Sequence, residues 1–277
     1  MKLSIVIPAW NAKPFLEDCI NSIERSGFKD KEIIIVDNAS SDGSIEKIAG
    51  LYPHIKFIKN KINVGVSPAS NQGVQASTGK YILLLDADTI IQDNALQELT
   101  NYMDNHPDVG LCGAMLRYQN GDLQHSAQRF PVLNTKLARI FPDSRWSKKI
   151  LTGDEYRNFT YDKPVEVDYL LGACHFISRK ALESVGPLDD RLFYGPHDCD
   201  YCLRMHLAGW RVIYNPDAVI IHRFNRLSRK KIKMFLKHLK CLSIYFLKHK
   251  YLFSRKRIYK QISKHKPHYL IAEVNKV

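Results

Sequence analysis

Short apolar runs recur along this chain and alternate with stretches of helical character, and this alternation constrains the fold more than any other feature. The runs at residues 3–8, 32–37 and 81–86 are rich in Ile, Leu and Val and too short for ordinary helices. Strands that are apolar along their whole length are typical of a parallel sheet covered by helices on both faces. The sequence therefore predicts an α/β fold with a single, mostly parallel central sheet.

The remaining elements follow the same rhythm. Helices are expected at about 13–26, 45–51, 70–76, 94–105, from 179 and at 198–208, and further strands at 55–58, 109–112, 167–178 and 211–216. Little pattern is visible between about 117 and 164. From residue 228 onward, apolar side chains at helical spacing with lysines between them predict a basic amphipathic helix.

The charge is divided unevenly along the 277 residues. Residues 1–222 hold 24 Lys and Arg against 27 Asp and Glu, whereas residues 223–277 hold 17 against one. A basic excess favours nucleic acid or an anionic membrane as partner, and here it points to the tail. No apolar run approaches the roughly 18 residues of a membrane span, no signal peptide is apparent, and six scattered cysteines suit reduced thiols. We therefore expect a cytoplasmic location.

Carboxylates follow two of the predicted strands. Asp37 ends the strand at 32–37, and Asp86 and Asp88 follow the apolar run YILLL. Because ligands of open α/β sheets bind at the carboxyl ends of strands, these side chains should line one crevice. The D-x-D spacing can hold Mg²⁺ or Mn²⁺ beside a nucleoside diphosphate, although a solvated turn that caps the next helix is an alternative. The glycine-rich phosphate loops of dehydrogenases and P-loop proteins are absent from the sequence.

A second cluster lies at the start of the helix predicted at 198–208. Asp198 and Asp200 could cap this helix through its dipole, or Asp198 could project as a general base. Cys199 and Cys202 form a C-x-x-C flanked by histidines, but no second ligand pair is evident, so buried thiols are favoured over zinc. His222 ends the run DAVIIH and could provide a nitrogen ligand to a metal.

Six segments together resemble, in order, the motifs of inverting family 2 glycosyltransferases with the GT-A fold. They are SIVIPAWN, EIIIVDNASSDGS, NVGVSPASNQG, YILLLDADT, DYLLGACHFISR and FYGPHDCDYCLRMHLAGWRVIYNPDAVIIH, and they span roughly residues 3–222. The chain is most similar to the rhamnosyltransferase-like branch that builds bacterial surface polysaccharides. The resemblance implies a GT-A domain at 1–222, with a nucleotide-binding part at about 1–115 and an acceptor part at about 116–222, followed by a helical extension at 223–277.

The resemblance also assigns roles to individual residues. It implies a nucleotide-sugar site formed by Pro8, Ala9, Asn11, Asp37, Asn38, Asn63, Gly65, Asn71, Asp86, Ala87, Gly172 and Ala173. It implies Asp88 and His222 as ligands of a divalent metal, Mg²⁺ or Mn²⁺, and Asp198 as the general base. His197 and Asp200 would face the acceptor, and His197 stands where the family usually has Glu, so an unusual acceptor is expected.

The activity implied is transfer of a sugar, with inversion, from a dTDP- or UDP-sugar to a hydroxyl of a glycan or lipid-linked glycan. A transferase that loads polyprenyl phosphate is an alternative that needs no base. A non-enzymatic basic protein that binds nucleic acid or membrane would leave the aspartate clusters unexplained, and no nucleic-acid partner is expected. The tail could lie on an anionic membrane at its inner face through Phe235, Leu239, Leu242 and Phe246, or pack on the catalytic domain as an ordinary helix.

Overall fold

A computed structural model describes residues 1–139, 143–156, 162–223 and 232–266 of the chain. The strands are β1 (Leu3–Ala9), β2 (Lys31–Asp37), β3 (Lys56–Lys59), β4 (Tyr81–Leu85), β5 (Thr89–Ile91), β6 (Val109–Arg117), β7 (Leu123–Gln124), β8 (Ala127–Gln128), β9 (Val165–Glu166), β10 (Tyr169–Leu170), β11 (Cys174–Ser178) and β12 (Arg211–His222). The helices are α1 (Leu16–Arg25), α2 (Ser44–Leu51), α3 (Val66–Gln75), α4 (Ala95–Asn105), α5 (Leu133–Ala138), α6 (Arg145–Asp154), α7 (Arg179–Val185), α8 (His197–Leu207), α10 (Ile232–His249) and α11 (Lys256–Ile262).

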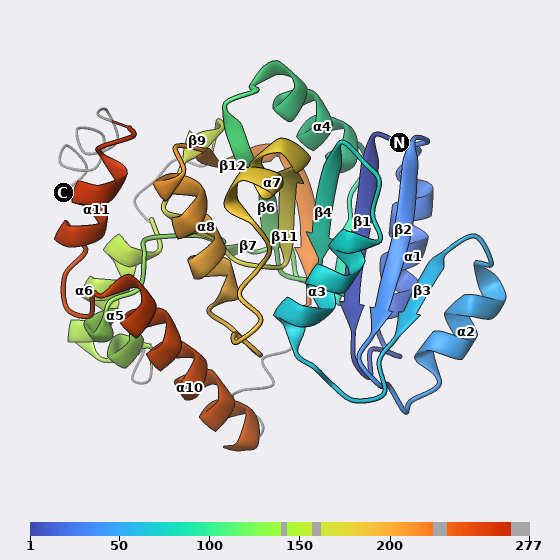
Figure 1. Ribbon diagram of the computed structural model, residues 1–277, viewed down its shortest axis with the longest axis horizontal. Coiled ribbons are helices and arrows are strands. Elements are labelled where there is room, and N and C mark those ends of the chain that lie inside the picture. Colours follow the sequence, from blue (N-terminus) through green and yellow to red (C-terminus); the bar gives the residue numbers. More distant parts are fainter. Residues whose placement is uncertain (140–142, 157–161, 224–231, 267–277) are drawn as a thin grey trace.

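One large central sheet has the strand order β3-β2-β1-β4-β11-β6-β12-β5 (Figure 1). The first four strands are parallel, as are β6 and β12. β11 lies between β4 and β6 and is antiparallel to both, and β5 is antiparallel to β12. The predicted α/β class with a single central sheet is confirmed, and the sheet is mixed because β11 enters it in the opposite direction.

Helices cover both faces of the sheet because its strands are apolar on both sides. Ile5, Ile7 and Leu83 pack in one buried cluster with the apolar faces of α1, α2 and α4. Val6 and Ile82, which are next to them in sequence, point the other way into a cluster with α3, α7 and α8. Both layers of helices are visible in Figure 1.

Two parts of the fold differ from what the pattern suggested. RVIYNP and DAVIIH form one strand, β12, whose register shifts between Asn215 and Val219. The weakly patterned region before residue 164 holds α5, α6 and the two-residue strands β7 and β8, and α11 lies in the tail. The shortest of these elements carry too few periodic residues to be recognised, and α6, with ten residues, has only three large apolar ones.

The tail packs on the rest of the protein. Tyr245 of α10 is fully buried, and its hydroxyl lies 2.6 Å from that of Tyr251. The Tyr259 hydroxyl of α11 donates to Asp168 at 2.6 Å, and the Lys266 ammonium lies 2.7 Å from Glu166. The alternative of an ordinary packed helix therefore holds for one face of α10.

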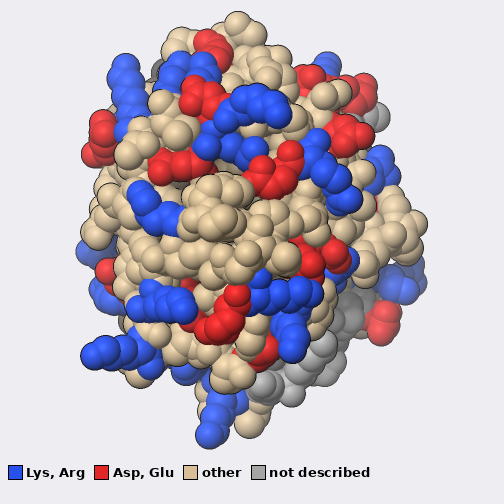
Figure 2. All heavy atoms as spheres, turned by 90° about the vertical axis from the view of Figure 1, so that its right-hand side faces the viewer, with Lys and Arg blue, Asp and Glu red and all other residues tan. Residues whose placement is uncertain are grey.

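Two general features bear on possible partners. In the described part of the chain, no helix is both long and apolar enough to span a membrane. Figure 2 shows the side of the molecule that lies at the right in Figure 1, where basic and acidic side chains are interspersed. The basic excess of the sequence is thus not concentrated on that face.

Candidate functional site

Asp86, Asp88 and His222 come together at one edge of the sheet. The two aspartates follow β4, and β12 brings His222 opposite Thr89 through its antiparallel pairing with β5. His222 Nε2 lies 3.4 Å from an Asp88 oxygen and 3.8 Å from an Asp86 oxygen. One ligand atom from each of the three residues lies within 4.8 Å of the other two. The fold thus brings the predicted metal ligands, Asp88 and His222, together with Asp86.

Gln124 orients His222, and sequence reasoning missed it. The Gln124 side-chain oxygen lies 2.8 Å from His222 Nδ1, and Gln124 is almost fully buried in β7. This contact suits a proton on Nδ1 and leaves Nε2 with its lone pair toward the aspartates. A two-residue strand in a region without pattern gave no signal for this glutamine.

The electrostatics of this cluster favour a cation. Enclosure in the site and the neighbouring Asp88 carboxylate raise the pKa of Asp86 above its usual range, against the attraction of His222. Two oxygen donors and one imidazole nitrogen suit a divalent ion such as Mn²⁺ or Mg²⁺. The alternative of a helix-capping turn does not apply here, because α4 begins only after Asn94. The residues present therefore fit a divalent metal.

A short backbone segment joins this cluster to the start of α8. The Asp86 amide donates to the Ala173 carbonyl at 3.1 Å, so the 172–173 segment lies beside the end of β4. A Cβ on Gly172 would lie 3.0 Å from His197 Nε2 and 3.6 Å from Asp198 Cβ. The segment predicted to flank the donor sugar thus lies between the carboxylate cluster and the predicted base.

The surroundings of Asp198 favour its ionised form. Burial opposes its charge, but His197, the Cys199 amide and His175 outweigh this and hold the pKa of Asp198 below its usual range. The Cys199 N–H donates to Asp198 at 2.8 Å, within the first turn of α8, where the helix dipole also favours a negative charge. A carboxylate of this kind can accept a proton.

His197 lies beside the base, and burial disfavours its charged form. Burial lowers its pKa, although Asp198 and Asp200 oppose this. Its Nδ1 is buried and, among the described residues, has no hydrogen-bond partner. A buried polar atom without a partner carries a free-energy cost, which a ligand that bonds to it would remove.

The predicted nucleotide residues of β1 and β2 gather around one turn. The Asn38 amide donates to Ala9 at 2.8 Å, and Asp37 accepts from the Ser40 amide at 2.9 Å. Asn11 accepts from the Ser41 amide at 2.9 Å. Pro8 precedes Ala9 at the end of β1, and Ala87 lies between the two aspartates that follow β4. These residues therefore lie at the carboxyl ends of neighbouring parallel strands, as expected.

Asn63, Gly65 and Asn71 shape the walls of this region. The Asn63 side chain accepts from the Gly65 amide at 3.0 Å. Gly65 has φ +96°, and a Cβ there would approach Phe193 to 2.7 Å, so only glycine fits. Asn71 exchanges hydrogen bonds of 2.9 and 3.0 Å with the Leu188 backbone. These bonds tie α3 to the loop before α8, and the role of the three residues toward a nucleotide stays a prediction.

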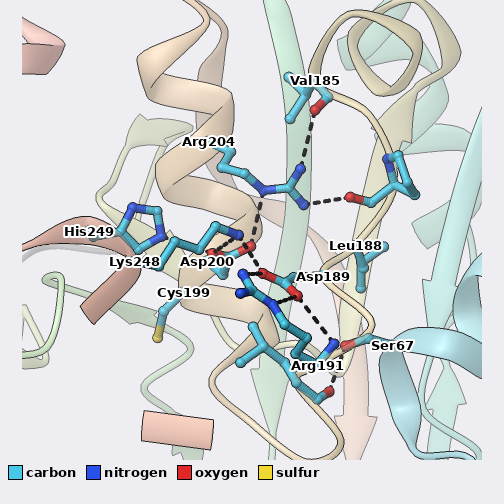
Figure 3. Close-up of polar contacts among 12 residues, drawn as sticks. Ser67, Val185, Leu188, Asp189, Arg191, Cys199, Asp200, Arg204, Lys248 and His249 are labelled. Atoms are coloured by element: carbon cyan, nitrogen blue, oxygen red, sulfur yellow. Dashed lines mark hydrogen bonds and ion pairs between the residues drawn. The ribbon is translucent and has the colours of Figure 1, made fainter. Parts of the chain in front are cut away.

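Asp200 is the centre of an ionic network between α8 and α10 (Figure 3). Its side chain is 1% exposed and contacts Arg204 at 3.0 Å, Lys248 at 2.7 Å and His249 at 2.8 Å. Lys248 also reaches Asp189 at 2.8 Å. The acceptor-side role of Asp200 stays a prediction, and these contacts show that it anchors α10.

Cys199 and Cys202 are buried inside α8. All six cysteines are buried and free. In the described ranges, the one group of side chains able to hold a metal is the Asp86–Asp88–His222 cluster. The interpretation of the C-x-x-C as apolar packing is therefore the one that fits.

Comparison with known proteins places the chain among enzymes. Residues 4–186 match the sequence model of the family described as Glycosyl transferase family 2. The N-acetylglucosaminyl-diphospho-decaprenol L-rhamnosyltransferase of Mycobacterium tuberculosis (strain ATCC 25618 / H37Rv) is 24% identical over 237 residues, which cover 79% of this chain and 75% of the relative. The poly-beta-1,6-N-acetyl-D-glucosamine synthase of Staphylococcus epidermidis is 23% identical over 219 residues, or 78% of this chain and 48% of that protein.

Solved structures with the GT-A fold resemble this one. The mannosyltransferase PcManGT from Pyrobaculum calidifontis, in complex with GDP-Man and Mn²⁺, superimposes with a TM-score of 0.63 at 18% identity, covering 96% of this chain and 69% of that one. GalNAc-T7 with UDP, GalNAc and Mn²⁺ gives 0.63 at 16% identity, covering 80% and 44%. At these identities the similarity shows the fold alone.

Proposed function

Because the chain belongs to glycosyl transferase family 2, we propose that it transfers a sugar, with inversion, from a nucleoside-diphosphate donor to a hydroxyl of a glycan or lipid-linked glycan. The donor is a dTDP- or UDP-sugar. Residues 1–222 form the catalytic domain, with the nucleotide part at about 1–115 and the acceptor part at about 116–222, and residues 223–277 are its basic extension. We place the enzyme in the cytoplasm.

One juxtaposition supports this proposal above all others. The segment Gly172–Ala173 is bonded to Asp86 on one side and packs against His197 and Asp198 on the other. A donor bound with its diphosphate at the Asp86–Asp88–His222 cluster would therefore have its sugar beside a carboxylate that is already ionised. This is the arrangement that a single displacement at the anomeric carbon needs.

In this mechanism Asp198 takes the proton from the acceptor hydroxyl as the hydroxyl oxygen attacks the anomeric carbon. The bond from that carbon to the diphosphate breaks in the same step, so the configuration inverts. The dipole of α8 and the Cys199 amide keep Asp198 ionised until the proton arrives. His197 adjoins Asp198, its Nε2 faces Gly172 and its buried Nδ1 has no partner among the described residues, so a group of the acceptor would bond to this imidazole.

Asp86, Asp88 and His222 would hold Mg²⁺ or Mn²⁺, with Gln124 fixing the imidazole. Such an ion supplies stabilisation of the negative charge that grows on a leaving diphosphate. The closeness of the three ligand atoms supports this proposal, since a cation would relieve the repulsion between the two carboxylates.

A thermal-shift screen with Mn²⁺ and UDP, dTDP and GDP tests the donor site. We expect a metal-dependent rise in melting temperature with one nucleotide, because a ligand that binds only the folded state stabilises it. Asp88→Ala should abolish the rise, whereas Asp93→Ala, at an exposed aspartate after β5, should keep it. A folded protein that responds to none of the nucleotides would contradict the proposal.

Replacing the base separates the two classes of acceptor. With a hydroxyl acceptor, Asp198→Asn should lower kcat by about 100- to 10,000-fold and leave the nucleotide shift intact. If the variant kept its full rate, the acceptor would be an anion such as polyprenyl phosphate, which needs no base. His197→Ala should change acceptor preference, and an unaltered preference and rate would remove His197 from the acceptor site.

A further inference from the structure

The outer face of α10 exposes a row of large apolar side chains. Ile232, Leu236, Leu239 and Leu247 follow one another at helical spacing and are 71%, 59%, 42% and 76% exposed. Phe235 adjoins them at 36%. Leu242, predicted to face lipid, is instead only 8% exposed, and Phe246, also predicted to face lipid, is partly buried against the core.

Lysines accompany this row. Lys233, Lys237 and Lys240 are exposed and are spaced so that they form a second row beside the apolar one. Residues 232–266 contain no Asp or Glu at all. The surface thus combines an apolar stripe of about 22 Å, taking 1.5 Å per residue, with a positive charge that nothing on the same helix offsets.

We propose that the outer face of α10 binds the surface of an anionic lipid bilayer, with the Ile232–Leu247 row among the acyl chains and the lysines at the headgroups. This combination is typical of helices that lie in the membrane interface. A second copy of the chain fits less well, because pairing two such faces would bring like-charged lysines together. α10 lies at the lower left of the molecule (Figure 1).

The inner face of the same helix contacts the loop at residues 194–196, directly before α8. His238 Nδ1 lies 3.3 Å from the Tyr194 carbonyl, and a Cβ on Gly195 would lie 3.2 Å from the same nitrogen. Asp198 follows in the first turn of α8. A bilayer on α10 would therefore hold a lipid-linked acceptor close to the base. This step rests on the proposed function, whereas bilayer binding itself does not.

Vesicle flotation of the full chain tests the surface. We expect binding to vesicles of phosphatidylcholine with phosphatidylglycerol and much weaker binding to phosphatidylcholine alone. Leu236→Ser with Leu239→Ser should weaken binding by tenfold or more, since each leucine contributes through its buried area. Lys233→Gln and Lys240→Gln should each weaken it about fivefold, and high salt should do the same.

Controls make the test decisive. Leu51→Ser changes a leucine that is 52% exposed on α2 and should leave flotation unchanged. Each variant is also tested for its nucleotide thermal shift, so that a fault in the donor site is recognised separately. The proposal is overturned if the wild-type chain fails to float with anionic vesicles. It is also overturned if the wild-type chain binds no vesicles but forms a dimer, and the double variant Leu236→Ser, Leu239→Ser dissociates that dimer.

Discussion

Neutralising Asp200 should destabilise the whole protein. Its carboxylate is 1% exposed and contacts two cationic side chains, from Arg204 and Lys248, and the imidazole of His249. Removing one partner of a buried ion pair costs about 3–5 kcal/mol, because the other charge is left uncompensated. In Asp200→Asn, Lys248 still pairs with Asp189, and Arg204 still donates to the carbonyl groups seen in Figure 3. The loss in the free energy of unfolding should therefore lie at the lower end of this range, about 3 kcal/mol.

The assay is urea unfolding followed by circular dichroism, with thermal melting beside it. A loss of about 3 kcal/mol corresponds to a melting temperature roughly 5 °C lower in a chain of this size. Asp93→Asn, at an exposed aspartate, should change the free energy of unfolding by less than about 0.5 kcal/mol. If Asp200→Asn behaved like Asp93→Asn, the network would not hold α10 on α8.

The same network predicts a pH dependence. Burial opposes ionisation of Asp200, but His249, Arg204 and Lys248 outweigh it and hold the pKa of Asp200 below its usual range. The ionised form is therefore favoured by folding, and its contribution is fully present above the unfolded-state pKa of about 3.9. The stability difference between wild type and Asp200→Asn should be constant above about pH 5 and shrink as the pH falls below about 4. A difference that grew on acidification would refute the reasoning.

Two further predictions concern the site. Gln124→Leu should weaken Mn²⁺ binding about 10- to 100-fold in calorimetric titration, because His222 loses the group that orients it. Gln97→Leu, on the exposed face of α4, should leave the affinity unchanged. If the two variants bound Mn²⁺ with equal affinity, Gln124 would not orient His222. Gly172→Ala should lower kcat/KM by about tenfold or more, because the new methyl group displaces His197, and His197→Ala in the same chain should recover part of the loss. Gly153→Ala, where a Cβ meets nothing within 4 Å, is the control, and strictly additive losses would contradict the steric explanation.

The sequence predicted the parallel half of the sheet well, because β1, β2 and β4 are continuous apolar runs with helices between them. It could not predict that β11 runs antiparallel between β4 and β6. An apolar run is the same pattern in either direction, and only the contacts of neighbouring strands decide its orientation. The mixed character of the sheet is therefore a property of the packing.

The candidate site, too, could be predicted from the sequence only in part. Asp86 and Asp88 could be placed from residues alone, since both follow a predicted strand. His222 was assigned through family resemblance, and its position depends on the pairing of β12 with β5. Gln124 and the network around Asp200 had no local signal, because each depends on side chains from segments far apart in the chain.

Contacts between the tail and α8 decide how the tail can be studied. Deleting residues beyond 226 would leave Asp200 and Asp189 without Lys248, and the fully buried Tyr245 would no longer fill its place in the core. A truncated chain would then lose stability around the helix that carries Asp198, and any loss of membrane binding or turnover would have two explanations. Substitutions on the outer face of α10 avoid this, because Leu236 and Leu239 are exposed and contribute little to folding. A role of the tail at a membrane should therefore be tested by point substitutions in the complete chain, with the nucleotide thermal shift as evidence that the catalytic domain is intact.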